Sequence, residues 1–376
     1  MLFDTYKLPV IRVVLAGMLV VLFATLFWTQ SRYPALNDKA IMEGSIQLED
    51  PLSFESLLSV DPSFPMWKKI TYTTINWVKT NKNGMTFGVL MGAAFLTLIR
   101  YLPRKSLKGR FANSAVGMAI GAPMGVCVNC AAPIAKGIYT AGARAELTLS
   151  AMIASPTLNI VVLTMAFGIM PVEIAVTKLA LSIFVILVVV PVIVRMSPGT
   201  EIATPPETES CEISMPATFP NESILSAVKG FTLDYLRDLW FIVSRTVPLM
   251  LIAGFLGAIV GNLVPLEAFA GAEASIILFL VVAVIGIFLP VPIGFDVIVA
   301  GTLLNAGLSS GLVMVLLFTL GIFSIYSFII VGSTISWRVA RNLSVAIVLI
   351  AVLAGLSVEA FHQYQMRQSL ELLMNL

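Results

Sequence analysis

Hydrophobic residues along this chain gather in long runs that are separated by short polar segments. Most of the runs are about 17–25 residues long, the length with which a helix crosses the roughly 30 Å hydrocarbon core of a bilayer. They predict an all-α, polytopic membrane protein with about nine transmembrane helices. The predicted spans are residues 8–28, 84–102, 113–140, 147–168, 171–195, 241–264, 275–301, 311–332 and 343–358.

The polar segments between the runs divide the chain into six parts. We expect an N-terminal anchor helix (1–28), an extramembrane loop with an interfacial helix (29–83), a first membrane-embedded half (84–195), a polar linker with a second interfacial helix (196–240), a second membrane-embedded half (241–358) and a C-terminal tail (359–376). The first run lacks the small-x-small site of a signal peptide, so it is expected to remain as an uncleaved anchor. Residues 196–225 contain five prolines, five glutamates and no lysine or arginine, a composition that cannot span a membrane.

Two of the predicted spans are interrupted by glycine and proline, which break helices. The first is interrupted at Gly121, Pro123, Gly125, Pro133 and Gly137, and the second at Gly286, Pro290, Pro292 and Gly294. An Ala-Gly pair follows each interrupted stretch, and a new apolar run follows each pair. Broken helices at matching places in two halves are typical of a transporter's central site, so we expect two related halves whose breaks face each other near the midplane. The alternative interpretation is a pair of ordinary kinks.

Composition and charge support a membrane location. The chain is 58% hydrophobic and 12% charged, whereas soluble domains are about half apolar and a quarter charged. Residues 100–110 contain five basic residues and no acid. Between two apolar runs this cluster predicts a cytoplasmic loop, a cytoplasmic N-terminus and a bacterial inner (plasma) membrane, and not a nucleic-acid site. The chain has no G-x-x-x-x-G-K-[ST] motif, so transport would be driven by a gradient, by consumption of the substrate or by a partner.

The soft ligands of the chain lie in the first break. Cys127 and Cys130 are three positions apart and share a face if the turn is helical, and Met124 lies near them. Two thiols and a thioether favour soft, thiophilic metals or metalloids. Such a species would be the substrate, because three cysteines and one histidine are too few for a four-cysteine zinc site or for an iron–sulfur cluster made by one chain. No resident cofactor, catalytic residue or enzymatic activity is expected. The alternatives are two small core residues or a thiol pair that exchanges electrons.

Several polar residues and prolines near the breaks are further candidates for lining a substrate path. They are Asn129, Pro133, Ser155, Asn159, Pro292 and Asn305. Asp296 follows the second break inside an apolar run, where a carboxylate is costly and usually functional, as a proton carrier or as the partner of a cation. Lys136 follows the first break and is its predicted coupling partner; the alternative is that Lys136 extends toward an interface. Lys178 lies inside a later span and is expected to extend toward an interface.

Residues 123–159 resemble a known family. With Cys127, Cys130, Pro133 and the segment Ser155-Pro-Thr-Leu-Asn159, this stretch is similar to the predicted-permease family that includes the ArsP-type organoarsenical efflux permeases. The resemblance implies two related halves joined by a variable polar linker, and a role for the thiols in binding arsenicals. The usual motif of the family has cysteines two positions apart, whereas these are three apart, and only Cys127 keeps its usual distance from the proline.

The sequence therefore favours a secondary-type permease that exports a small thiophilic metal or metalloid species, such as a trivalent organoarsenical. The first alternative is a membrane thiol–disulfide oxidoreductase that uses Cys127 and Cys130, although the chain has no second pair to receive the electrons. The second is a membrane subunit that anchors partners through residues 29–83. The expected partners are the lipid bilayer and the substrate, a homo-oligomer is left open, and no nucleic acid is expected.

Overall fold

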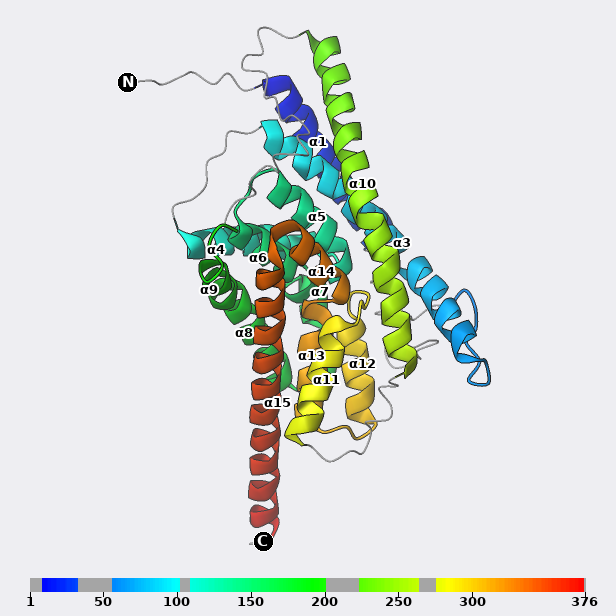
Figure 1. The fold of residues 1–376 in the computed structure, drawn as a ribbon. Helices are drawn as coiled ribbons and strands as arrows, with labels where there is room; N and C mark the ends of the chain where they lie inside the picture. The colour runs from blue at the N-terminus through cyan, green and yellow to red at the C-terminus, as the bar shows by residue number, and fades with distance from the viewer. Residues whose placement is uncertain (1–8, 33–55, 102–108, 201–222, 264–274, 375–376) are drawn as a thin grey trace.

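A computed structural model describes residues 9–32, 56–101, 109–200, 223–263 and 275–374 (Figure 1). Every regular element in these residues is a helix. The elements are α1 (Val10–Phe27), η1 (Trp28–Arg32), α3 (Met66–Tyr101), α4 (Arg110–Met124), α5 (Val128–Thr140), α6 (Ala145–Thr157), α7 (Ile160–Ile169), α8 (Val172–Phe184), η2 (Val185–Val189), α9 (Val190–Arg195), α10 (Ile224–Leu263), α11 (Ile276–Phe288), α12 (Phe295–Asn305), α13 (Ser310–Ile322), α14 (Ile325–Val331), η4 (Gly332–Ser336) and α15 (Trp337–Met374). Most of the basic loop, most of the polar linker with Cys211, and residues 33–55 of the predicted extramembrane loop lie outside the described residues.

Four helices of the described chain are long and apolar enough to cross a membrane: Val10–Gln30, Val172–Arg195, Ile224–Leu263 and Ile325–Ser369. A fifth span results if α6 and the later part of α7, which are bent by 44° at their junction, cross together. Helices α11, α12 and α13 are apolar but shorter. These spans indicate an integral membrane protein, whereas the count of about nine crossings remains a prediction.

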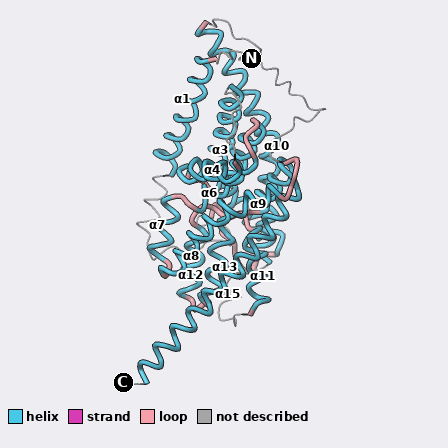
Figure 2. Tube along the Cα trace, turned by 90° about the vertical axis from the view of Figure 1, so that its left-hand side faces the viewer, coloured by secondary structure: helices cyan, strands magenta, loops and turns pink. Residues whose placement is uncertain are grey.

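The boundaries of several helices differ from the predicted ones. Helix α3 runs without interruption for 36 residues, so the expected interfacial helix within residues 29–83 is continuous with the span that follows it. The predicted spans 147–168 and 311–332 are each broken, because the side chains of Asn159 and Ser324 cap the new helices α7 and α14. Helix α15 continues through the predicted C-terminal tail and projects beyond the other helices (Figures 1 and 2).

Glycine stripes allow the helices around the first break to approach closely. Gly84, Gly88 and Gly92 of α3 face α5, and a Cβ built on Gly88 would lie 2.5 Å from the carbonyl oxygen of Cys130. Two glycines of α4, Gly117 and Gly121, meet the backbone of α6 in the same way. Small residues four positions apart are typical of tightly packed membrane helices. The first break is therefore held between α3 on one side and α6 on the other.

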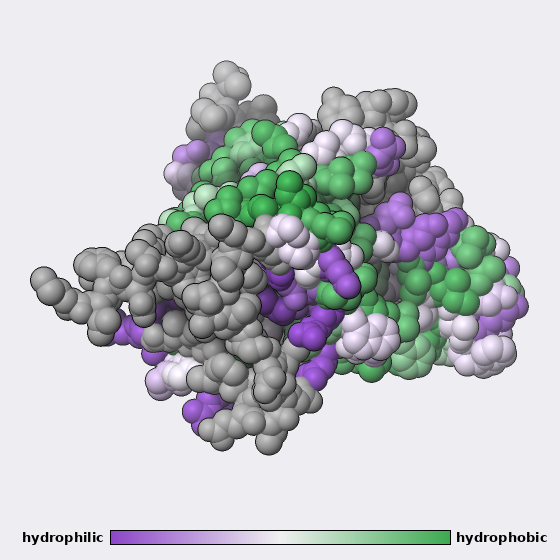
Figure 3. Space-filling view, turned by 90° about the horizontal axis from the view of Figure 1, so that it is seen from above, coloured by the Kyte–Doolittle hydropathy of each residue, from purple (hydrophilic) through white to green (hydrophobic). Residues whose placement is uncertain are grey.

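A cluster of charged residues joins α1, α3 and α10 where α10 begins. Arg12 pairs with Asp234 at 3.1 Å. Asp238, which is 1% exposed, accepts hydrogen bonds from Arg100 and Thr97. Seen from this end of the molecule, hydrophilic residues interrupt the hydrophobic surface (Figure 3). Both carboxylates thus have cationic partners, and the ion pairs link the N-terminal helix α1 and helix α3 to α10.

We predict that Gly88→Ala lowers the free energy of unfolding by about 1–3 kcal/mol, because the added methyl forces α3 away from α5. The measurement is the thermal stability of the detergent-solubilised protein. Gly17→Ala is the matched control, since nothing lies within 4 Å of a Cβ there, and it should be neutral or slightly stabilising. Equal effects of the two substitutions would contradict close packing at Gly88.

Candidate functional site

The first break separates α4 from α5. Helix α4 contains Pro123 and ends at Gly125, whose φ of 58° is readily adopted only by glycine. The backbone of Val126 has no helical partners here and bonds to the side chain of Ser155 on α6. The Ser155 hydroxyl accepts from the Val126 N–H at 3.1 Å and donates to the Val126 C=O at 3.2 Å. Cys127 then begins α5 as its N-cap. Protein groups thus satisfy the unwound backbone, as an apolar interior demands.

The second break separates α11 from α12. Helix α11 ends before Leu289, and α12 begins after Gly294, which has a φ of 76°. The two prolines between them supply no N–H donor, so the carbonyls of the segment are the groups that need partners. The indole N–H of Trp77 on α3 donates to the Pro290 carbonyl. Trp77 is fully buried, and the second break is therefore anchored on a helix far away in sequence.

The two breaks touch each other. The side-chain amide of Asn129, near the start of α5, donates to the carbonyl of Val291 in the second break at 3.3 Å. Its oxygen accepts a hydrogen bond from the hydroxyl of Ser324 at 2.9 Å, and Ser324 lies at the junction of α13 and α14. Ser327 donates to the carbonyl of Val128 at 3.3 Å. Three interruptions from distant parts of the sequence therefore share one buried hydrogen-bond network.

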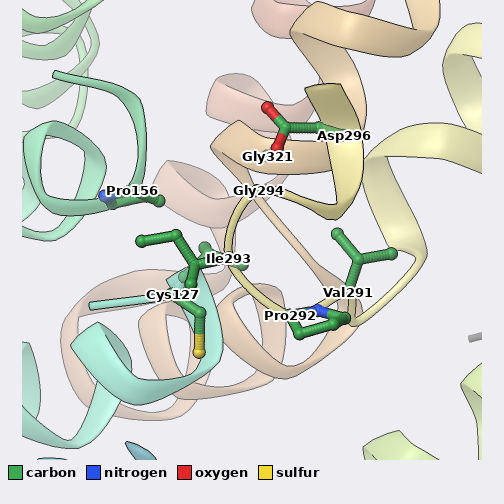
Figure 4. Close-up of a pocket in the computed structure, with 9 residues that line it drawn as sticks. Cys127, Pro156, Val291, Pro292, Ile293, Gly294, Asp296 and Gly321 are labelled. Atoms are coloured by element: carbon green, nitrogen blue, oxygen red, sulfur yellow. The ribbon is translucent and has the colours of Figure 1, made fainter. Parts of the chain in front are cut away.

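A small cavity lies where the breaks meet (Figure 4). Its lining residues come from both breaks and from α6, α12 and α13: Cys127, Val128, Pro156, Val291, Pro292, Ile293, Gly294, Asp296 and Gly321. Its volume is about 10 Å³, which is roughly the space of one water molecule. The centre of the site is therefore closed in this conformation.

The two cysteines differ in their surroundings. Both are buried, and neither forms a disulfide. The sulfur of Cys127 accepts a hydrogen bond from the backbone N–H of Cys130 at 3.3 Å, and a helix N-terminus favours negative charge. Cys130 faces the glycine stripe, and a Cβ on Gly84 would lie 2.7 Å from its sulfur. In Figure 4 the Cys127 sulfur points away from the Asp296 carboxylate, so the two do not converge on one point in this conformation.

Asp296 forms an ion pair with Lys178. The carboxylate is in the first turn of α12, the ammonium is on α8, and both side chains are almost wholly buried. Gly321 of α13 makes room for the pair, since a Cβ there would lie 2.6 Å from the Asp296 Oδ2 atom. The sequence alone led us to expect that Lys178 extends to an interface. This expectation was wrong, because the Lys178 side chain is buried and binds Asp296. Helix α8, which precedes the linker, is thus joined to the helix after the second break by a buried ion pair.

Lys136, the predicted coupling partner of Asp296, lies elsewhere. Its ammonium group lies 5.8 Å from the centroid of the Phe241 ring on α10, and its charged neighbour is Arg245. Lys136 and Asp296 each follow a break closely in sequence, and this suggested that they form a pair. However, Asn129 makes the contact between the breaks, and Lys136 is seven positions further along α5. Lys136 therefore lies about two helical turns beyond that contact.

The other predicted site residues divide into three groups. Pro292 lines the cavity with Cys127 and Asp296. Asn129, Ser155 and Asn159 support broken backbone; Asn159 caps α7 and donates to the Ser155 carbonyl at 2.9 Å. Pro133 is buried within α5, Met124 is half-buried at the end of α4, and Asn305 is exposed at the end of α12. The structure thus does not bring Met124 or Asn305 to the cavity.

Comparisons with known proteins identify the family of this chain. Residues 85–360 match the family model described as predicted permease, of the ArsP type. The chain belongs to this predicted permease family. One relative is the UPF0718 protein YraQ of Escherichia coli (strain K12), which is 25% identical over 281 residues that cover 73% of this chain and 76% of YraQ. No solved structure matches the chain. Membership of a permease family favours a transporter over an enzyme.

Sequence reasoning missed three contributors to the permease site. Trp77 lies within residues 29–83, where an interfacial helix was expected, and Ser324 lay within a span that was expected to be unbroken. Gly321, which leaves space for Asp296, lay in the same span. The pairing of Lys178 with Asp296 could have been suspected from the sequence. Each is a lone charge in its own apolar run, and opposite charges in separate runs can neutralise each other. Among the described residues, no cluster of three His, Cys, Asp or Glu side chains is placed to hold a metal ion.

The buried pair can be tested by a double-mutant cycle. We expect Lys178→Gln and Asp296→Asn each to destabilise the protein by about 3 kcal/mol or more, since each leaves a buried charge without its partner. The double variant should recover most of this loss. The measurement is denaturation in detergent, with the less buried Arg12–Asp234 pair as the comparison. Additive losses in the double variant would contradict the pairing.

Proposed function

We propose that this protein is a secondary-type permease of the bacterial inner membrane that exports a small thiophilic metal or metalloid species, such as a trivalent organoarsenical. The breaks would form the centre of the path, Cys127 and Cys130 would bind the substrate, and Asp296 with Lys178 would couple its movement to protons. The observation that carries the proposal is the cavity that Cys127 and Asp296 line together, at the contact of two helix breaks. Irregular backbone at membrane depth is tolerated where it lines such a path.

We further propose that the chain consists of two related halves with about nine crossings. Support comes from the order of elements, since α4–α5–α6–α7 and α11–α12–α13–α14 follow the same scheme. In each series a helix breaks, a short helix follows, a glycine turn leads into a 13-residue helix, and a side-chain cap begins the last helix. The turns at Gly142 and Gly307 have φ values of 95° and 90°. Both turns have the two hydrogen bonds of a Schellman motif. In each turn the glycine N–H donates to the carbonyl three positions earlier, and the next N–H donates to the carbonyl five positions before it.

The proposed orientation places the N-terminus and the basic loop in the cytoplasm. It rests on the excess of lysine and arginine in residues 100–110 and on the positive-inside rule. Arg100, Tyr101 and the start of α10 would then lie at the cytoplasmic end.

Burial of the thiols favours transport over redox exchange. Cys127 is 5% exposed and Cys130 is 2% exposed. A protein partner that exchanges disulfides must bring its sulfur in line with the attacking thiolate, so access limits the rate. A small substrate that enters through the breaks does not face this limit.

The thiol role predicts that Cys127→Ser and Cys130→Ser each abolish most of the protection that the protein gives against trivalent methylarsenical. A second thiol strengthens binding by about 10²-fold or more through its effective concentration, so either loss should nearly equal the double loss. The measurement is growth and accumulated arsenic in a host without other arsenical efflux, with arsenite tested in parallel. Cys211→Ser is the matched control. Full protection by the double variant would return both cysteines to packing roles.

The coupling role predicts that Asp296→Asn abolishes transport driven by a pH gradient in inverted membrane vesicles, because an amide cannot carry the proton. Substrate binding should survive. The double variant with Lys178→Gln tests the same point without an uncompensated lysine, and all rates are normalised to folded protein. Asp61→Asn is the control, since Asp61 is exposed. Gradient-driven transport at the wild-type rate in either variant at position 296 would show that this carboxylate is only structural.

A further inference from the structure

Lys136 is a buried cation that the proposed transport chemistry does not use. It lies on α5, is 8% exposed and forms no ion pair with the described residues. Its ammonium group contacts the face of Phe241 on α10. A cation–π contact offsets only part of the cost of removing a lysine from water. An unpaired ammonium at this depth therefore favours an anion that lies beside it.

A second cation lies close to the same ring. The guanidinium carbon of Arg245 lies 5.4 Å from the centroid of Phe241, and the charge of Arg245 acts on Lys136. Arg245 is exposed at the surface of α10, whereas Lys136 lies beneath it. Two like charges that share one ring repel each other, and an anion that contacts both would remove this repulsion.

The acids of α10 do not serve as that anion. Asp234 already binds Arg12 and Tyr101, and Asp238 binds Arg100 and Thr97. Asp238 also precedes Arg245 by seven residues, a separation of about 10 Å along the helix. Both acids are thus engaged in the N-terminal half of α10, and Lys136 has no carboxylate partner among the residues that the structure describes.

The position along α10 indicates which kind of anion fits. A Cβ on Gly254 would meet the ring of Trp77, which binds the second break, so Gly254 marks the level of the breaks. Arg245 precedes it by nine residues, or about 13 Å of helix. If the breaks lie at the midplane, as in the proposed function, Arg245 lies close to the boundary of the hydrocarbon core, where phosphate groups begin. Trp240, which is 70% exposed, is typical of this boundary.

We propose that Lys136 and Arg245, which lie over the same Phe241 ring, form a binding site for a phosphate group. Arginine and lysine are the side chains that bind phosphate in proteins, and basic pockets between membrane helices bind anionic headgroups. The phosphate belongs to an anionic lipid or to a soluble anion, which share this chemistry. The depth of the site rests on the proposed function, but phosphate binding can be tested without any transport.

The test is thermal unfolding of the purified full-length protein in dodecyl maltoside. One arm adds phosphatidylglycerol against phosphatidylcholine, and the other adds sodium phosphate against sodium chloride at equal ionic strength. We expect stabilisation by about 2–4 °C in at least one arm. Lys136→Gln and Arg245→Gln should lose the shift, Lys136→Arg should keep it, and Arg237→Gln, an exposed cation of the same helix, is the matched control.

The pattern of results decides both the site and its source. A shift with phosphatidylglycerol alone identifies a lipid headgroup, and a shift with inorganic phosphate identifies a soluble anion. No shift in either arm, or an undiminished shift in both Gln variants, overturns the site. A protein that shows the shift but fails the thiol and proton tests would retain this site while the proposed transport function fails.

Discussion

The structure depends on how the backbone of broken helices is satisfied inside an apolar protein. Each break exposes N–H and C=O groups that lipid cannot solvate, and each such group costs several kcal/mol if it stays without a partner. Here side chains from other helices provide the partners: Ser155 for Val126, Trp77 for Pro290 and Asn129 for Val291. Because these partners are far away in sequence, the breaks can exist only after the surrounding helices have packed. The glycine stripes of α3 and α4 bring the backbones close enough for this packing.

The same constraint explains which parts of the fold could be predicted from the sequence. Prolines and glycines marked both main breaks, because their effect on a helix is local. The breaks at Asn159 and Ser324 escaped notice, since a polar residue in an apolar run can equally well bond to the preceding turn of a continuous helix. Which cation meets Asp296 depends on packing between helices α8 and α12, and spacing along the chain carries no information about it. The resemblance to the permease family came from the motif around Cys127, which is contiguous in sequence.

The cavity and the ion pair are connected through α12. Asp296 both lines the cavity and binds Lys178, so a change in its charge changes the force between α8 and the second break. A proton or a cationic substrate that neutralises the carboxylate removes the attraction to Lys178, whereas deprotonation restores it. The hydrogen bond from Asn129 to Val291, which joins the two main breaks, does not depend on this charge. This gives the proposed coupling a physical form, in which the charge of one carboxylate changes how firmly α8 holds the second break.

The cavity is too small to hold the proposed substrate, so this conformation is the closed one. A space of about 10 Å³ is too small for an arsenical with a methyl group, whose atoms need several times the volume of a water molecule. Substrate can therefore occupy the site only after the breaks separate, and separation requires the interbreak hydrogen bonds to yield. These bonds run through neutral amide, hydroxyl and carbonyl groups, which contribute only about 0.5–1.5 kcal/mol each. Thiols that exchange with the hydroxyl groups of a trivalent arsenical release water and form sulfur–arsenic bonds, and these bonds can offset the loss. In the proposed cycle, neutral polar contacts thus keep the empty site closed without making it costly to open.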